Sequence, residues 1–378
     1  MLKKEYIYLY LTRFCYSLAN TLIDIYGTVL LYKNGLSVAQ IFLIYAIRFG
    51  LMGIITPFSI VLSTRLGIGV TSFIANLTRI TFSYVILFNI TDNITFLILL
   101  LALPGGLSNP LAAVLSANHV QSNHRGKYNS LRIISKILGA AIANLIILYG
   151  INYNQQMLLF VVVMTFFMLD SLFTFMVSFK PQKLKANAFK ETLTYITKTK
   201  DSFKLLYILR TAQIAERLFI PLYLYLALEN FVLFSAVISV SLIFQIILML
   251  FSGYFTDKNI SKMNNIVTIL RLITTSIFII TRNKVIISIN KATFDSIEQI
   301  YDMVYISSIE NIIKKNPKEN SLLASSGEMC LCFTELLCFS LIALIALYSA
   351  TGAFIFMFAC SIISTIMMNK MIQKHLKQ

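Results

Sequence analysis

Long apolar runs constrain this chain more than any other feature of its sequence. Eleven runs are long enough to cross a bilayer as a helix, which takes about 20 residues. Of the 378 residues, 57% are hydrophobic and only 13% are charged, which is too little polar surface for a soluble protein of this size. The sequence therefore predicts an all-α membrane protein. The apolar runs are 6–32, 38–63, 69–90, 94–118, 128–150, 156–179, 205–228, 231–255, 264–281, 321–348 and 350–371.

A twelfth stretch, 284–310, is apolar but carries Lys291, Asp295, Glu298 and Asp302. At 100° per residue, these four side chains project within an arc of about 60° on one side of a helix. Each charge at the bilayer centre costs roughly 2.5–3.5 kcal/mol on insertion scales, so the stripe cannot face lipid. If the stretch spans the membrane, the stripe faces a water-filled cavity or partner charges. The alternative is an amphipathic helix between two spans.

The distribution of basic residues decides between these alternatives. With twelve spans and a cytoplasmic N-terminus, the cytoplasmic segments hold 20 lysines and arginines and the outer loops hold three. This ratio obeys the positive-inside rule, and the asymmetry is much poorer if 284–310 is not a span. We therefore predict twelve spans with both termini in the cytoplasm. The absence of tryptophan and the abundance of Ile, Lys and Asn indicate an AT-rich bacterial genome, hence the inner membrane.

The two halves of the sequence resemble each other weakly. Residues 10–13 (YLTR) match 207–210 (YILR) at an offset of 197 residues, and 127–131 (KYNSL) match 318–322 (KENSL) at an offset of 191. At the second offset, 284–310 corresponds to a clear span, 96–119. We therefore predict two six-helix bundles, 1–179 and 205–378, joined by a basic cytoplasmic linker, 180–204. Parallel repeats of this kind are typical of secondary transporters.

With this architecture in place, the chain resembles the major facilitator superfamily. The signature G-x-x-x-D-[RK] of that family follows the eighth span as Gly253, Asp257 and Lys258, whereas Ser59 and Ser63 stand where the first-half copy has glycine and aspartate. The resemblance implies alternating access to a central cavity lined by spans 1, 4, 7 and 10. It also implies a small-molecule solute, a monomer and no cofactor. The loop with the signature is expected to brace one side of the transport cycle.

Charged candidate residues fall inside three of those four spans, the first, the seventh and the tenth. In the first, Asn20 and Asp24 share a face, and Asp24 is a candidate for binding a cation or proton, or else a structural partner for a nearby arginine. In the seventh, Glu216 and Arg217 lie deep in the span. Contact with the solute and a structural ion pair are equally consistent with that position.

The tenth span supplies Lys291, Asp295, Glu298 and Asp302 as further candidates for a solute or proton site. Three neighbouring acids favour protonation of at least one of them, which suits a proton carrier. The alternative is internal ion pairing with Arg48, Arg79 or Arg271. Arg79 and Arg271 lie at similar places in the third and ninth spans, which favours a structural role for those two. Over spans 1, 7 and 10, the candidates comprise five acids and two bases. This balance favours a cationic or zwitterionic solute, or protons with a neutral solute, over an anion.

Other functional classes fit the sequence less well. No histidine lies in a catalytic or zinc-binding motif, and the five cysteines all fall in apolar runs, so we predict neither an enzyme nor a metal site. The net charge of +16 is explained by membrane orientation rather than by nucleic acid. A multidrug efflux carrier and a non-transporting receptor or lipid-handling protein remain alternatives.

Overall fold

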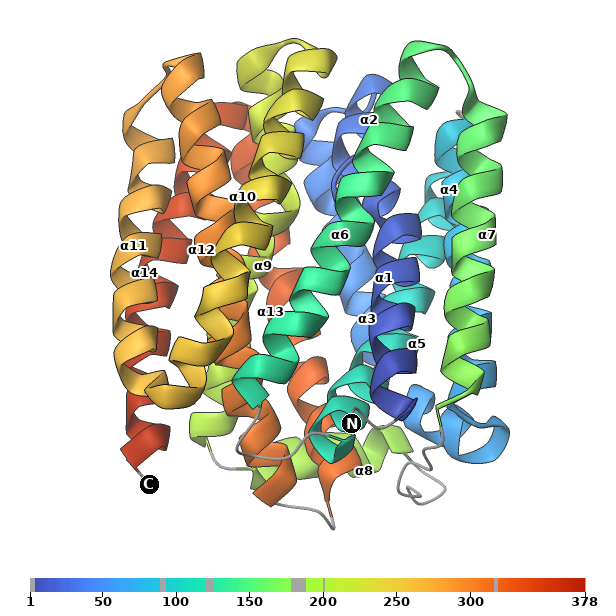
Figure 1. The fold of residues 1–378 in the computed structure, drawn as a ribbon, viewed down its shortest axis with the longest axis vertical. Coiled ribbons are helices and arrows are strands. Elements are labelled where there is room, and N and C mark those ends of the chain that lie inside the picture. Colours follow the sequence, from blue (N-terminus) through green and yellow to red (C-terminus); the bar gives the residue numbers. More distant parts are fainter. Residues whose placement is uncertain are drawn as a thin grey trace.

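The computed structural model describes residues 4–88, 93–119, 125–177, 188–199, 201–315 and 319–377, which form a bundle of α-helices (Figure 1). Most of the helices run side by side along the long axis of the molecule. The helices are α1 (Lys4–Asp24), α2 (Gly27–Lys33), α3 (Val38–Leu66), α4 (Ile68–Leu87), α5 (Ile94–His119), α6 (Arg125–Asn152), α7 (Gln156–Phe175), α8 (Ala188–Lys198), α9 (Asp201–Leu228), α10 (Phe231–Lys258), α11 (Ile260–Ile280), α12 (Lys284–Lys315), α13 (Asn320–Tyr348) and α14 (Ala350–Lys377).

Within the described residues, ten segments are long and apolar enough to cross a membrane. The two further long helices, α9 and α12, fall short of that criterion because they carry the charges discussed above. Both lie in the bundle beside the ten segments and run along the same long axis (Figure 1). The all-α membrane fold is therefore confirmed, and α12 takes the place predicted for the tenth span.

Asparagine side chains define where several of these helices begin. Asn93, Asn230, Asn259 and Asn283 each accept a hydrogen bond from a backbone N–H in the first turn of α5, α10, α11 and α12, respectively. The first N–H groups of a helix have no partner within it, so an asparagine at the N-cap stabilises the helix start. Ser37 and Gln40 form a reciprocal capping box at the start of α3.

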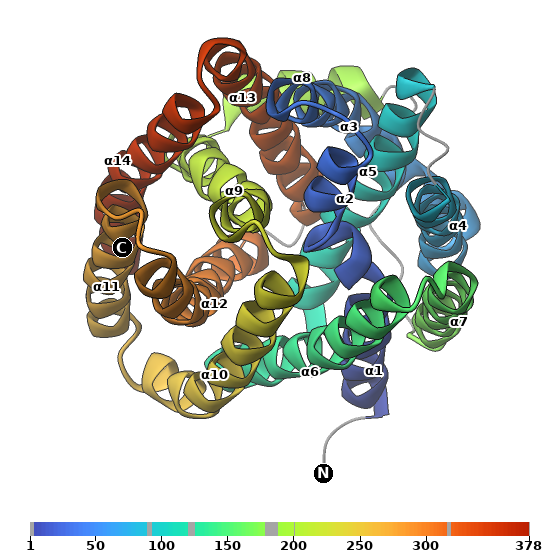
Figure 2. The ribbon, with the colours of Figure 1, turned by 90° about the horizontal axis from the view of Figure 1, so that it is seen from above.

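Seen from above, α1–α7 lie on one side of the molecule and α9–α14 on the other (Figure 2). We call these sets the first half and the second half. They meet where α3 packs along α13 and where α6 packs along α10. The arrangement is the one that the predicted division at 180–204 would produce, and the division itself stays a prediction.

The short helix α8 lies across one end of the bundle, at the same end as both chain termini (Figure 1). It packs on α13 and α3, and the Tyr195 hydroxyl donates a hydrogen bond to Glu319 at 2.7 Å. Burial, together with this carboxylate, raises the pKa of Tyr195. The helix therefore connects to the second half through side-chain contacts as well as through the chain.

The first predicted span, 6–32, is confirmed as a segment long and apolar enough to cross a membrane, Ile7–Lys33, and it contains a break. It is divided into α1 and α2, with Ile25 and Tyr26 between them. The break coincides with Gly27, a poor helix former, and with Tyr26, whose hydroxyl is hydrogen-bonded to Asn144 and Ser235. Asp24 is consequently the last residue of α1, where its side chain is exposed.

Gly139 allows α6 to approach α1 closely. A Cβ at this position would lie 2.4 Å from the carbonyl oxygen of Phe14, which is backbone and cannot rotate away. We expect Gly139→Ala to destabilise the protein by about 1–2 kcal/mol through overpacking. Gly105→Ala is the matched control, because there the new Cβ meets the flexible Met52 Sδ at 2.5 Å. Thermal unfolding in detergent measures both, and equal melting temperatures would contradict the prediction.

A candidate solute site between the two halves

A cavity of about 360 Å³ lies between the two halves of the bundle. Its walls come from α1, α5 and α6 on one side and from α9, α12 and α13 on the other. A volume of this size suits a small organic solute. The charged residues that line it are Arg13, Asp24, Arg132, Lys136, Arg210, Arg217, Asp302, Glu310 and Glu328.

Asp24 lines this cavity and also two of the smaller cavities beside it. One, of about 160 Å³, lies between the halves and is lined by Lys136, Arg217, Lys291 and Asp295 among others. The other, of about 60 Å³, lies within the first half, and Asn20 lines it. Asp24 is therefore at the centre of the hollow part of the molecule.

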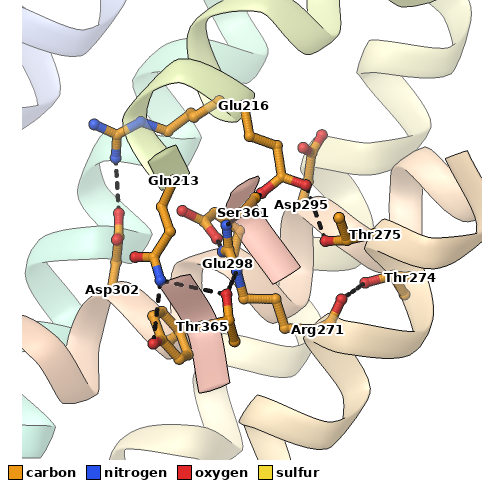
Figure 3. A network of polar contacts seen from close by, with 12 residues as sticks. Gln213, Glu216, Arg271, Thr274, Thr275, Asp295, Glu298, Asp302, Ser361 and Thr365 are labelled. Atoms are coloured by element: carbon orange, nitrogen blue, oxygen red, sulfur yellow. Dashed lines mark hydrogen bonds and ion pairs between the residues drawn. The ribbon is translucent and has the colours of Figure 1, made fainter. Parts of the chain in front are cut away.

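A chain of alternating charges runs from the interior of the second half to this cavity (Figure 3). Arg271 on α11 pairs with Glu216 on α9 at 2.5 Å and with Glu298 on α12. Arg210 on α9 lies 3.8 Å from Glu298. The chain reaches the cavity through Asp302, which pairs with Arg210 and also with Arg217 at 2.8 Å.

Neutral side chains complete this network. Thr275 donates a hydrogen bond to Glu216 at 2.9 Å (Figure 3). Ser361 donates a second one at 2.5 Å, and Gln213 accepts one from Arg210 at 2.7 Å. Arg271 and Glu216 are fully buried. Charges buried in this way are tolerated only when they are paired and hydrogen-bonded, so this part of the network is structural.

Lys291 and Asp295 form a separate pair one turn apart on α12. The Lys291 ammonium lies 2.5 and 2.6 Å from the two carboxylate oxygens of Asp295. Ser241 on α10 donates a further hydrogen bond to Asp295 at 2.5 Å. The pair lines the 160 Å³ cavity, but each charge already has its partner within the protein.

Asp24 and Lys136 differ from the other charged residues of the cavities. Asp24 is exposed and Lys136 is half-buried, and both line the two cavities between the halves. Among the described residues, neither has an ion pair or a hydrogen bond from its charged group. The negative charge of Asp24 favours the positive charges of Lys136 and Arg217, although no salt bridge joins Asp24 to either residue. The cavity thus presents one anionic and one cationic group that are available to a ligand.

Side chains join the two halves on both sides of the cavities. Towards the end opposite the termini, the Tyr26 hydroxyl donates to Asn144 and lies 2.8 Å from Ser235 Oγ on α10. Towards the termini, Asn129 donates to Ser307 and Glu310 of α12, both at 3.1 Å. The cavities therefore lie between two layers of contact.

The structure separates the candidate residues of the sequence into three groups. Asp24, Arg217, Lys291, Asp295 and Asp302 line the cavities between the halves, although the last four are also ion-paired. Asn20 lines the small cavity of the first half. Glu216 and Glu298 line none of these cavities and pair with Arg271 instead, which is the alternative considered for each of them.

The signature motif after the eighth span is only partly described. Lys258 ends α10 and is exposed. The surroundings of Gly253 and the side chain of Asp257 lie outside what the structure describes. The predicted bracing role of this loop therefore stays a prediction.

Lys136 and Arg132 on α6 are cavity residues that sequence reasoning missed. Both lie in the fifth span, whereas the family resemblance directed attention to spans 1, 4, 7 and 10. The available signal was the sequence itself, since Lys136 interrupts an apolar run at mid-span. With the residues of α6 and the arginines of α1 and α9 included, the 360 Å³ cavity is lined by five bases and four acids. The excess of acids expected from the sequence is not present there.

The first half has its own buried polar cluster. Arg79 on α4 donates to Asn76 and to Ser108, both at 2.8 Å, and Asn76 donates to Asp170 on α7 at 2.8 Å. Arg79 and Arg271 thus occupy comparable positions in the two halves, and each has buried polar partners. This agrees with the structural role that we predicted for both arginines.

Comparison with known proteins gives a consistent result. The sequence model of the Major Facilitator Superfamily matches residues 9–289. No curated protein matches the chain significantly. Among solved structures, the human organic anion transporter MFSD10 (TETRAN) is similar with a TM-score of 0.68 at 12% identity, covering 97% of this chain and 100% of that one. A bacterial homologue of the iron transporter ferroportin, in its outward-facing state, has a TM-score of 0.66 at 12% identity and covers 100% of both chains.

Proposed function

Because the chain belongs to the Major Facilitator Superfamily, and is therefore a multi-pass membrane transporter rather than an enzyme, we propose that it moves a small zwitterionic solute by alternating access. In this mechanism the two halves rock about a solute site near the middle of the membrane. The cavities between the halves, enclosed by contacts on both sides, are suited to that cycle.

The observation that carries the choice of solute is the pair of available charges, Asp24 and Lys136. Lys136 is half-buried and Asp24 is exposed to the cavities, and neither has an oppositely charged partner among the described residues. A charge that is partly removed from water gains from such a partner. A solute with an ammonium and a carboxylate group would satisfy both. A purely cationic solute would leave Lys136 unpaired, and an anion would leave Asp24 unpaired.

The proposal includes proton linkage and orientation. The end of the bundle that carries both termini and α8 is assigned to the cytoplasm on the basis of the distribution of basic residues. The protein is proposed to act as a monomer in a bacterial inner membrane, driven by the proton gradient. In the second half, buried acids outnumber buried lysines and arginines among the described residues, which supports protons as the coupling ion.

The test compares matched sets of ligands on the purified protein. Each α-amino acid is supplied together with its amide, which keeps only the cation, and its N-acetyl derivative, which keeps only the anion. We expect a thermal shift from at least one free amino acid and at least tenfold weaker binding of both derivatives, because each leaves one charge of the site unpaired. Uptake of that amino acid into proteoliposomes, with and without a pH gradient, then tests transport.

Variants assign the two charges. Asp24→Asn should no longer discriminate against the N-acetyl derivative, and Lys136→Gln should no longer discriminate against the amide. Lys370→Gln, which changes an exposed lysine of α14 outside the cavities, is the control and should bind as the wild type does. Stabilisation of the wild type by amides or by N-acetyl derivatives, but by no free amino acid, would overturn the zwitterion assignment.

A further inference from the structure

Glu335 on α13 is a fully buried acid without a hydrogen-bond partner among the described residues. Other buried acids in the described bundle have partners: Glu216 and Asp302 have arginines, and Asp170 has Asn76. An isolated ionised carboxylate is so costly away from water that the group takes a proton instead.

The position of Glu335 places it at the contact between the two halves. On α13, Cys332, Leu336 and Phe339 contact α3, and all three project within about 100° of Glu335 on the helix. The helices approach closely here, since a Cβ at Gly53 would lie 3.1 Å from Cys332 Cβ and one at Gly50 would lie 3.1 Å from Leu336. This packing excludes water around Glu335 for as long as α3 and α13 stay together.

A cation lies across the same contact without reaching Glu335. Arg48 on α3 stacks over the rings of Tyr45 and Phe49, with its guanidinium carbon 5.1 and 4.9 Å from the two ring centres. It forms no salt bridge with any described residue, and its Nε has no hydrogen-bond partner among them. The titratable groups that act on or beside Glu335 are Arg48 of α3, Arg210 and Arg217 of α9, Tyr305 of α12, and Glu328, Cys332 and Cys338 of α13.

We propose that Glu335 is a proton-binding site that couples protonation to the packing of α3 against α13. The carboxyl group is neutral while the helices are packed, and it loses its proton to entering water when they separate. Arg48 then provides the opposing charge. This proposal deepens the proposed function, on which it rests, by naming the group that would link a proton to the movement of the two halves.

Cys332 supplies a built-in probe of the same contact. It is fully buried against α3, so a thiol reagent reaches it only when α3 and α13 separate. In a protein that keeps Cys332 but has serine at the other four cysteines, the rate of reaction with N-ethylmaleimide is measured between about pH 5.5 and 8.5. Dividing by the rate for the denatured protein at the same pH removes the intrinsic pH dependence of the thiol.

The expected result is a normalised rate that rises with pH by up to about tenfold per pH unit, because one proton leaves for each opening event. In Glu335→Gln, whose amide mimics the neutral acid, the rate should stay low and independent of pH. Glu328→Gln is the matched control, two helical turns away on the same face of α13, and should keep the pH dependence. A flat profile in the protein with Glu335, or an unchanged slope in Glu335→Gln, would overturn the proposal.

A second measurement compares the melting temperature of Glu335→Gln with that of the wild type. If Glu335 is neutral in the packed state, Glu335→Gln should melt at the same temperature as the wild type at pH 6 or below. A large loss of stability would show that the carboxylate is held as an anion, which also contradicts the proposal. Neither experiment uses a solute, so failure here leaves the zwitterion site standing, and failure of the ligand screen leaves the Glu335 result readable.

Discussion

Replacing Arg271 with methionine is expected to cost about 3–5 kcal/mol of folding free energy, the usual result of removing one partner from a buried ion pair. Arg271 is fully buried and pairs with both Glu216 and Glu298. Without it, Glu216 keeps only neutral hydrogen-bond donors, and Glu298 keeps only Arg210 at 3.8 Å. Thermal unfolding of the purified protein in detergent measures the loss.

Two further variants show whether the cost comes from the unpaired acids. Arg282→Met changes an exposed arginine and should leave the melting temperature nearly unchanged. Combining Arg271→Met with Glu216→Gln and Glu298→Gln should recover part of the stability, because no net charge is then buried. If Arg271→Met melts with Arg282→Met, the ion-pair chain does not stabilise the second half.

The sequence was sufficient to predict α12 as a span, although its hydropathy alone was not. The mean hydropathy of this helix is lowered by Lys291, Asp295, Glu298 and Asp302. Arg210, Glu216 and Arg217 lower that of α9 in the same way. The distribution of lysines and the repeat do not depend on mean hydropathy, because they report orientation and ancestry. For this reason they located the helix where hydropathy was ambiguous.

The partners of those charges could not be predicted in the same way. The stripe on α12 spans only about 60°, yet its members contact three different helices: Asp295 meets α10, Glu298 meets α11 and Asp302 meets α9. Which neighbour a side chain reaches depends on helix packing at the scale of a few ångströms. Helix periodicity identifies a shared face and carries no information on what lies opposite.

Asn144→Leu is expected to favour separation of the halves at the end opposite the termini by about 30-fold or more. Asn144 is fully buried on α6 and donates to the Ser235 carbonyl at 3.2 Å and to Ser239 Oγ at 2.5 Å, both on α10. It also accepts the hydrogen bond of the Tyr26 hydroxyl. Losing these bonds should cost the closed arrangement about 2 kcal/mol or more, since each is worth roughly 0.5–1.5 kcal/mol and its partner stays buried.

Spin labels measure this shift directly. With the five native cysteines replaced, labels at Gln155→Cys and Arg282→Cys report the separation of the two halves, because both positions are exposed at this end and lie on opposite halves. Asn144→Leu should increase the population at long distance, and Ser239→Ala should do so more weakly. Ser135→Ala is the control, because Ser135 is half-buried on the same helix and bonds only to Leu131 of its own helix.

The measured distances show which contacts hold the two halves together at the end opposite the termini. If the distance distribution of Asn144→Leu equals that of the control, the aromatic contacts at this end are sufficient to hold the halves together. These include Tyr26 against Phe234 and Phe42 stacked on Phe219 at 3.8 Å. If the distribution shifts as expected, the hydrogen bonds of Asn144 decide how often this end opens. In Asn144→Leu, the Ser235 carbonyl and the Ser239 hydroxyl lose the Asn144 amide as a partner while the halves are closed, and water can reach both groups when the halves separate. We therefore expect the second result.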